Sequence, residues 1–217
     1  MSSITAVVPV RKGSQRVPNK NIKSFAGSSL LEIKIESLKS LGDLLDDIVV
    51  SSDCADMLAI AKDLGVKTHV RDSYFASSEV NNSQFFRNLA ESISGDNLMY
   101  SPVTCPLISK ETYSKCIDSF RRIGKPVATV REIKHHMWQS GKPLNYSIEN
   151  SPNSQDLPDI VYLTYGVCLI SREDMIRNSN VVTLESTFIK LNELESIDID
   201  TPLDFEVAEY LYKSKNT

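Results

Sequence analysis

Four cations follow an apolar run near the start of the chain, in the segment VVPVRKGSQRVPNKN from Val7 to Asn21. They are Arg11, Lys12, Arg16 and Lys20, and no acidic residue lies among them. Gly13 and Ser14 lie between them, and backbone N–H groups at such positions can approach an anion closely. A basic loop of this kind suits a flexible, highly charged ligand such as a triphosphate. The competing interpretation is a solvated surface loop, the usual place of a charge cluster.

Neither of two familiar phosphate-binding motifs accounts for this loop. The sequence contains neither GxxxxGK[ST] nor GxGxxG, its eight glycines are scattered, and both Gly-Lys pairs precede proline. The sequence therefore argues against a P-loop NTPase and against a dinucleotide-binding Rossmann domain.

A pair of acids near the other end of the chain is the second chemical feature. In the stretch ESIDIDTPLDFE, Asp198 and Asp200 alternate with Ile197 and Ile199. At the end of a strand, this spacing points both carboxylates to one face and both isoleucines to the core. Two neighbouring carboxylates repel each other, and Mg²⁺, which prefers one or two carboxylates plus phosphate oxygens and water, removes that cost. The alternative is that these acids only cap a helix that begins near Pro202.

The basic loop and the acid pair together indicate nucleotidyl transfer. In that reaction an acceptor oxygen attacks the α-phosphorus of a nucleoside triphosphate and pyrophosphate leaves, while Mg²⁺ and the cations neutralise the charge. We expect cations of the basic loop and the pair of Asp198 and Asp200 to carry out this chemistry, with the two aspartates as ligands of Mg²⁺.

Composition is that of an ordinary soluble protein. The chain has 217 residues, of which 41% are hydrophobic and 24% charged, so we expect one domain over residues 1–217. A formal net charge of -4 opposes general nucleic-acid binding. The four cysteines are far apart and form no CxxC pair, which argues against a zinc site or a disulfide framework. No run approaches the length of a membrane span, and we expect a cytoplasmic protein without a membrane partner.

Apolar β-rich runs alternate with stretches of helical period along most of the chain. Strands are predicted over 4–10, 47–51, 66–70, 97–100, 127–131, 160–170 and 188–191. Helices are predicted over 29–41, 53–64, 82–93, 110–122 and 202–212, with Ser52 and Asp53 as candidate caps of the second. This alternation predicts a three-layer α/β/α, Rossmann-like fold with a mainly parallel sheet and a ligand site at the carboxyl ends of the strands.

The alternation fails between Ile133 and Pro158. This segment is rich in Asn, Ser and Pro and contains the only tryptophan, so we expect a small excursion from the sheet. It is interpreted as a lid, a dimerisation arm, or both.

Several segments resemble the acylneuraminate cytidylyltransferases, the CMP-sialic acid synthetases. The opening loop is similar to that family's signature, approximately [IL]-x-A-R-x-x-S-[KQ]-x-x-P-x-K-N, and SIDIDTPLDFEVAE (Ser196–Glu209) is similar to its last motif. Weaker similarities occur in the same order as in the family, at IVVSSD, VRDSYFASS, TCPL and KHHMW. The resemblance covers nearly the whole chain.

The resemblance implies a nucleotidyltransferase fold and a nucleotide, CTP, that the residues alone do not specify. It implies that Arg11 and Lys20 hold the triphosphate, that Asn21 and the region of Arg71 contact the cytidine, and that Asp198 and Asp200 bind Mg²⁺. The nucleotide-binding set expected on this basis is Arg11, Gly13, Ser14, Lys20, Asn21, Arg71 and Ser77. It also implies a homodimer, in which the arm of one chain reaches the active site of the other.

Two departures from the family cluster at the acceptor site. The family's Q-P-T-S-P-L-R is PVTCPLI (Pro102–Ile108) here, and its R-x-N-G is LTYG (Leu163–Gly166), so a Gln and two Arg are absent. Thr104, Tyr165 and Lys142 are the candidate acceptor-binding residues, and Arg131 and Lys134 are further candidates to replace the missing cations. Sialic, legionaminic and pseudaminic acid, an eight-carbon Kdo-like sugar, and a hydroxyl, phosphate or phosphonate acceptor all remain open.

Two other classes of protein share some of these features. A glycosyltransferase of GT-A type has a similar sheet and a D-x-D metal site, but its acid pair is expected in mid-chain and without the basic loop. A noncatalytic nucleotide-binding paralogue would bind CTP without turnover. Release of pyrophosphate from CTP distinguishes the proposed enzyme from both.

Overall fold

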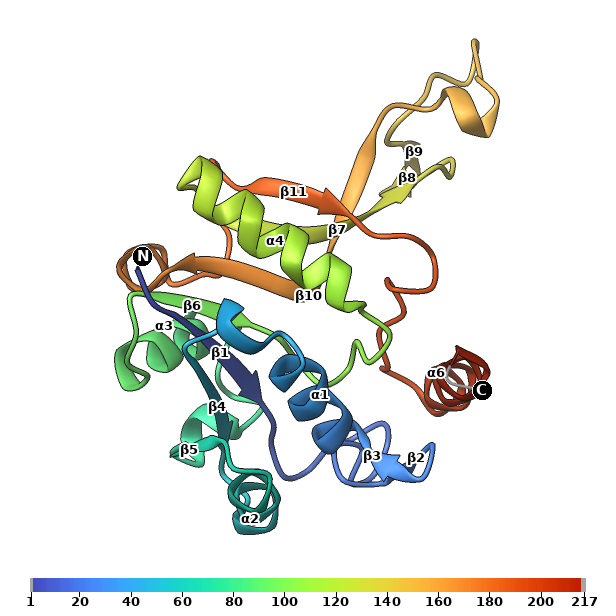
Figure 1. Cartoon of the computed structure of the whole chain (residues 1–217). Coiled ribbons are helices and arrows are strands. Elements are labelled where there is room, and N and C mark those ends of the chain that lie inside the picture. Colours follow the sequence, from blue (N-terminus) through green and yellow to red (C-terminus); the bar gives the residue numbers. More distant parts are fainter. Residues whose placement is uncertain (1, 216–217) are drawn as a thin grey trace.

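The computed structural model describes residues 2–215 and contains a seven-stranded sheet with helices on both faces (Figure 1). In spatial order the strands are β11 (Thr187–Lys190), β7 (Val127–Ile133), β10 (Ile160–Ser171), β6 (Asn97–Tyr100), β1 (Ile4–Pro9), β4 (Asp47–Ser52) and β5 (Lys67–Val70). The helices are α1 (Leu30–Lys39), α2 (Ala55–Asp63), α3 (Asn82–Ser92), α4 (Lys110–Ile123), α5 (Arg172–Asn178) and α6 (Pro202–Lys215). Two short strands, β2 (Ser24–Phe25) and β3 (Ser28–Ser29), form a hairpin before α1.

The sheet is mainly parallel, as the alternation of elements predicts. Among the described strands of this sheet, β10 runs antiparallel to both of its neighbours, and the other adjacent pairs are parallel. The fold class predicted from the sequence is therefore confirmed.

The sheet separates two hydrophobic cores, because successive side chains of a strand point to opposite faces. In β1, Ala6 and Val8 join the core that contains α1, α2, α4 and α6, whereas Val7 joins the core that contains α3 and α5. The strands therefore have both faces covered, which explains why β1 and β4 are nearly continuous apolar runs in the sequence.

Two local predictions are wrong. Residues 197–200 do not form a strand, because they pair with no strand of the sheet. Neither Ser52 nor Asp53 caps α2, whose N-cap is Cys54 without a side-chain hydrogen bond. Ser52 Oγ instead accepts a hydrogen bond from the Cys54 N–H at 3.0 Å, and the Asp53 carboxylate accepts one from the Lys12 N–H at 2.9 Å. Asp53 therefore fixes the basic loop rather than the helix.

The segment of residues 133–158, which runs from the last residue of β7 to just before β10, projects from the body and is called the arm below (Figure 1). It contains a hairpin of β8 (Trp138–Gln139) and β9 (Lys142–Pro143), whose two turn residues have the positive φ that tight hairpins require. Asn145 follows the hairpin and binds the chain that precedes it: its buried side chain donates to the His135 carbonyl and accepts from the Met137 N–H. The arm is thus held by its own hydrogen bonds.

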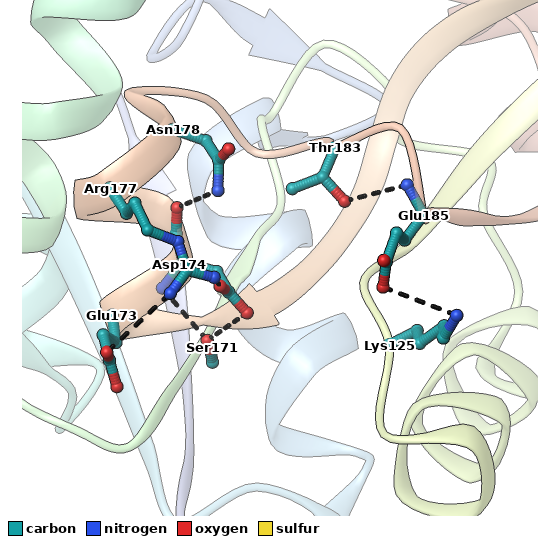
Figure 2. A network of polar contacts seen from close by, with 8 residues as sticks. All are labelled: Lys125, Ser171, Glu173, Asp174, Arg177, Asn178, Thr183 and Glu185. Carbon is teal, nitrogen blue, oxygen red and sulfur yellow. Dashed lines mark hydrogen bonds and ion pairs between the residues drawn. The ribbon is translucent and has the colours of Figure 1, made fainter.

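A polar network lies where β10 ends and α5 begins (Figure 2). Ser171 caps α5 by accepting from the Asp174 N–H at 3.1 Å, and Arg177 forms ion pairs with Asp174 and Glu173. Ser171 lies opposite Asn97, the first residue of β6, so this network marks the amino-terminal edge of the parallel strands. The network is therefore at the opposite end of the strands from their carboxyl ends, where a ligand site is predicted.

Candidate active site

A cleft of about 690 Å³ lies at the carboxyl ends of β1, β5 and β6. Its walls are the loop after β1, the turns after β5 and β6, the irregular middle of β10, and residues 198–200. The lining residues that concern the chemistry are Arg11, Ser14, Arg16, Lys20, Asn21, Arg71, Phe75, Ser77, Phe85, Tyr100, Thr104, Tyr165, Asp198 and Asp200. The topology of the sheet explains this position, because parallel strands present their carboxyl ends at one edge.

Contacts from distant parts of the chain fix the first turn of the basic loop. Arg71 donates from Nη2 to the Val10 carbonyl at 2.5 Å, and Asn21 donates from Nδ2 to the Arg11 carbonyl at 3.1 Å. Arg11 Nη1 in turn donates to the Ala76 carbonyl at 2.9 Å, which ties the loop to the turn after β5. The loop is therefore anchored rather than free in solvent.

Three of the four loop cations line the cleft. Arg11, Arg16 and Lys20 do so, whereas Lys12 does not. The Lys20 side chain is buried, and its Nζ donates to the Ile199 carbonyl. Burial lowers the pKa of Lys20, and the nearby Asp200 and Asp198 oppose that effect. The loop therefore brings positive charge directly against the acid pair, which the interpretation as a solvated loop does not explain.

Asp198 and Asp200 both line the cleft, although no strand positions them. The alternation predicted from their spacing holds, because Ile199 is buried in the core and Ile197 packs against it. Asp198 is exposed to solvent, but partial desolvation of its carboxyl group raises its pKa. The nearby charge of Asp200 raises this pKa further. Asp200 is paired with Arg16 at 2.6 Å in a largely exposed ion pair.

The cap of α6 is formed by other residues. The Asp204 N–H donates to Thr201 Oγ1 at 3.2 Å, and the Asp204 carboxylate accepts from the Thr201 N–H at 2.7 Å and from the Asp200 N–H at 3.1 Å. This reciprocal arrangement is a capping box. The carboxylates of Asp198 and Asp200 are therefore not needed as caps and are left to face the cleft.

Two carboxylates in a cleft with loop cations fit a Mg²⁺ site. Mg²⁺ takes one or two carboxylates and completes its oxygen ligands with phosphate and water. No group of three or more His, Cys, Asp and Glu side chains suited to a metal occurs among residues 2–215.

Arg71 is buried in the wall of the cleft with unused hydrogen-bonding capacity. It is 3% exposed, and its Nε and Nη1 have no hydrogen-bond partner in the described structure. Its guanidinium lies 5.2 Å from the centre of the Phe85 ring. Burial lowers its pKa to about 10, so the group remains charged at neutral pH. A buried donor without a partner is costly, so these two nitrogens are an unsatisfied polar feature of the wall of the cleft.

The bulge in β10 brings Tyr165 to the cleft. The pairing of β10 with β7 changes register between Leu163 and Cys168, and Tyr165 has a φ of +54° at this point. Its ring stacks on Phe86 at 6.3 Å between centroids. Thr104 lines the neighbouring wall, and its carbonyl accepts from the Ile199 N–H at 2.9 Å.

The structure brings most of the predicted site residues together. Of the twelve, ten line the cleft: Arg11, Ser14, Lys20, Asn21, Arg71, Ser77, Thr104, Tyr165, Asp198 and Asp200. Gly13 lies next to Ser14 with a φ of +85°, which favours glycine, but does not line the cleft. Lys142 lies on β9 in the arm, outside the cleft of its own chain.

The other two candidate cations are held elsewhere. Arg131 is bound to Ser196 and Glu193, and Lys134 to the Leu157 carbonyl and Asp159. Neither lines the cleft. Four cations do line it, and none of them comes from the segments 102–108 or 163–166.

Sequence reasoning missed part of the site. Arg16 carried a signal, since it is one of the four loop cations, but it was not assigned a role. The sequence contains no signal that marks Phe85 or Tyr100 as site residues. Phe85 lies on a helix, and Tyr100 ends a strand of ordinary apolar residues. Cys105 is a packing residue as its surroundings predict, and burial raises the pKa of its thiol to about 12.

Comparison with known sequences gives a consistent result. The cytidylyltransferase family model matches residues 5–151. The chain is 25% identical to a pseudaminic acid cytidylyltransferase of Campylobacter jejuni, over 95% of each chain. It is 26% identical to a CMP-N,N'-diacetyllegionaminic acid synthase of Legionella pneumophila, over 96% of this chain and 95% of that one.

Solved structures support the same fold. A CMP:2-keto-3-deoxy-manno-octonic acid synthetase in complex with CTP superposes with a TM-score of 0.71 at 13% identity, over 99% of this chain and 100% of that one. A 4-diphosphocytidyl-2C-methyl-D-erythritol synthase from Anaerococcus prevotii superposes with a TM-score of 0.69 at 13% identity, over 98% and 99%. At these identities the similarity concerns the fold. No helix within residues 2–215 is long and apolar enough to span a membrane.

Proposed function

Because the chain belongs to the cytidylyltransferase family, we propose that it transfers CMP from CTP to an acidic sugar and releases pyrophosphate. The acceptor we propose is a nonulosonic acid such as pseudaminic, legionaminic or sialic acid. The observation that carries the proposal is the cleft, in which Arg11, Arg16 and Lys20 lie together with Asp198 and Asp200. The names of the curated relatives support this class of acceptor.

The residues of the chain take distinct parts in the proposed reaction. Arg11, Arg16 and Lys20 bind the triphosphate and stabilise the charge that builds on the leaving pyrophosphate. Asp198 and Asp200 hold Mg²⁺, which supplies further positive charge to the phosphate oxygens when bound. Arg16 is free to turn from Asp200 to a phosphate, because an exposed ion pair of this kind has little net stability.

The remaining wall of the cleft binds the two organic groups. Asn21 and Arg71, which both line the cleft, contact the cytidine in this proposal. Thr104 and Tyr165 contact the acceptor. The walls 102–108 and 163–166 supply no cation for the acceptor carboxylate. A homodimer in which the arm of one chain reaches the cleft of the other would bring Lys142 to it, and we propose this assembly.

The direct test is pyrophosphate release with Mg²⁺, each of CTP, ATP, GTP and UTP, and a panel of pseudaminic, legionaminic, sialic and Kdo-type acids. We expect CTP to be used well ahead of the other nucleotides, and one or more nonulosonic acids to be required. Equal release from all four nucleotides would contradict the cytidylyl assignment. CTP binding without turnover on any acceptor would favour a noncatalytic paralogue.

The loop offers a matched pair of variants for the same assay. Arg11→Ala removes a cation that lines the cleft, and we expect a loss of turnover on the order of 100-fold, the scale of one preorganised charge contact. Lys12→Ala removes a neighbouring cation outside the cleft and should leave turnover near the wild-type value. Equal effects of the two substitutions would mean that only the net charge of the loop matters.

A further inference from the structure

A lysine is buried behind the cleft without an acidic partner. Lys34, on α1, is 2% exposed, and no salt bridge among the described residues includes it. Its Nζ donates to the Cys105 carbonyl at 3.0 Å and to Tyr113 Oη at 2.7 Å, and lies 5.4 Å from the centre of the Tyr113 ring. Lysine is almost never fully buried unless its ammonium has partners, so these contacts require an explanation.

The contacts of Lys34 converge on the segment that runs from β6 to α4. Tyr113 Oη also lies 2.8 Å from Ser101 Oγ, so the ammonium holds Cys105 directly and Ser101 through Tyr113. Both Ser101 and Cys105 are buried, and between them the chain passes along the wall of the cleft at Pro102, Val103 and Thr104. Lys34 therefore fixes this wall from the side that faces the core.

The same segment contacts the acid pair from the other side. Cys105 Sγ lies 3.8 Å from Asp198 Oδ1, and the Thr104 carbonyl accepts from the Ile199 N–H at 2.9 Å. Because residues 197–200 pair with no strand, these contacts replace the sheet as the support of Asp198. Cys105 thus connects Lys34, through its carbonyl, with Asp198, through its thiol.

We propose that Lys34 is a positioning residue for Asp198, which it acts on through the carbonyl of Cys105 and the wall of the cleft. A packed neighbour that contacts no ligand can set the geometry of a site in this way, and loss of such support costs about 10-fold to 100-fold in activity or metal affinity. The expected fall in catalytic activity rests on the proposed function, whereas the expected change in the packing around Cys105 does not.

The test uses Lys34→Met, which keeps the length and apolar stem of the side chain but removes the charge and the donors. We expect kcat to fall about 10-fold or more while KM for CTP stays within about twofold, because the loop cations that bind the triphosphate do not contact Lys34. Lys39→Met is the matched control, since Lys39 lies on the same helix, is exposed and, within residues 2–215, pairs with Glu36 alone, and it should behave as wild type.

Thiol labelling gives a readout that needs no substrate. All four cysteines are buried, so a thiol reagent followed by peptide mass spectrometry should label the wild type slowly. In Lys34→Met we expect Cys105 to be labelled faster, on the order of 10-fold, with Cys116 and Cys168 unchanged, because only the wall of the cleft opens locally. Burial raises the pKa of the Cys105 thiol and the charge of Lys34 partly opposes this, so loss of that charge alone would slow the labelling reaction.

Tyr113→Phe provides a second variant in case Lys34→Met folds poorly. It keeps the ring and removes only the hydroxyl between Lys34 and Ser101, so we expect smaller changes of the same sign in kcat and in Cys105 labelling. Labelling of Cys105 at the wild-type rate in both variants, or equal acceleration at all four cysteines, would overturn the proposal. Selective labelling of Cys105 in a protein that shows no cytidylyl transfer would retain the structural link and contradict the proposed function.

Discussion

Asp198 and Asp200 are separated by one residue but have different electrostatic surroundings. Asp198 lies beside Thr104 and Cys105, and burial raises its pKa. Asp200 is partly exposed and forms an ion pair with Arg16. Asp204, four residues further on, caps α6. The three acids therefore offer a direct comparison between ligand binding and helix capping.

We expect Asp198→Asn and Asp200→Asn each to lose most turnover, about 100-fold or more, because each removes a full charge from the proposed Mg²⁺ site. Asp204→Asn is the control, since an Asn oxygen can still accept from the Thr201 N–H, and it should keep ordinary turnover. Activity is measured by pyrophosphate release with Mg²⁺ and after treatment with EDTA. Wild-type activity that survives EDTA, or an active Asp198→Asn enzyme, would contradict the metal site.

The stability of Asp198→Asn follows from the direction of the pKa shift. Folding raises the pKa of Asp198 above its ordinary 3.8, so above that raised pKa the ionised side chain destabilises the folded state. Without divalent cations at neutral pH, Asp198→Asn should therefore melt at a higher temperature than wild type. The difference should shrink as the pH falls toward 3.8, because the wild-type carboxyl then becomes protonated. Thermal denaturation at several pH values measures this.

At the scale of elements, the bulge of β10 determines how closely two walls of the cleft approach. An added Cβ on Gly166 would lie 2.5 Å from Ile108 Cδ1, 3.4 Å from Thr129 Oγ1 and 3.6 Å from Cys105 Cβ. Gly166 is therefore required by close packing between β10 and the segment before α4, rather than by its φ.

We expect Gly166→Ala to lower the free energy of unfolding by about 1 to 3 kcal/mol, because the added methyl group overpacks this contact. Ile108→Val removes Cδ1, so the double variant Gly166→Ala/Ile108→Val should be more stable than the sum of the two single effects. Chemical denaturation of the four proteins in the cycle gives the coupling. If the changes in the free energy of unfolding are strictly additive, Ile108 does not oppose the added methyl group, and another part of the bulge accommodates it.

At the scale of the whole molecule, the arm exposes apolar side chains far from the core. Trp138 is 56% exposed, Leu144 51% and Ile148 61%. The arm keeps its shape through Asn145 and contacts of Tyr146 with His136 and Trp138, so these apolar groups are presented on an ordered element. Such a surface is suited to a two-fold interface.

We expect a homodimer, with a mass in solution twice the 24.2 kDa of the chain. The double variant Trp138→Ser/Ile148→Ser should be monomeric at micromolar concentration, because it removes apolar area from the arm. Leu184→Ser changes a fully exposed apolar residue outside the arm and should leave the dimer intact. Light scattering measures the three masses. A fully active wild-type monomer would contradict both the dimer and the proposed role of Lys142.

The sequence by itself determined the features that depend on local spacing. The alternation of apolar runs predicted the α/β fold, because strand and helix periods are properties of short segments. The spacing of Asp198, Ile199 and Asp200 predicted which side chains face the core, although no strand forms there. The basic loop predicted a phosphate site because four cations without an acid already form a local electrostatic feature.

Only the tertiary structure decided features that depend on contacts between distant residues. It decided that three of the four loop cations line the cleft. The Asp53 carboxylate binds the backbone N–H of Lys12, whereas the carbonyls of Ala76 and Ile199 accept hydrogen bonds from the side chains of Arg11 and Lys20. It gave β10 its antiparallel direction through pairing with β6 and β7. Helical spacing places Lys34 on the same face of α1 as Leu30 and Leu38, but only the fold supplies the Cys105 carbonyl and the Tyr113 hydroxyl that bind its buried ammonium. These features depend on burial and on contacts between distant segments, and the local spacing of residues encodes neither.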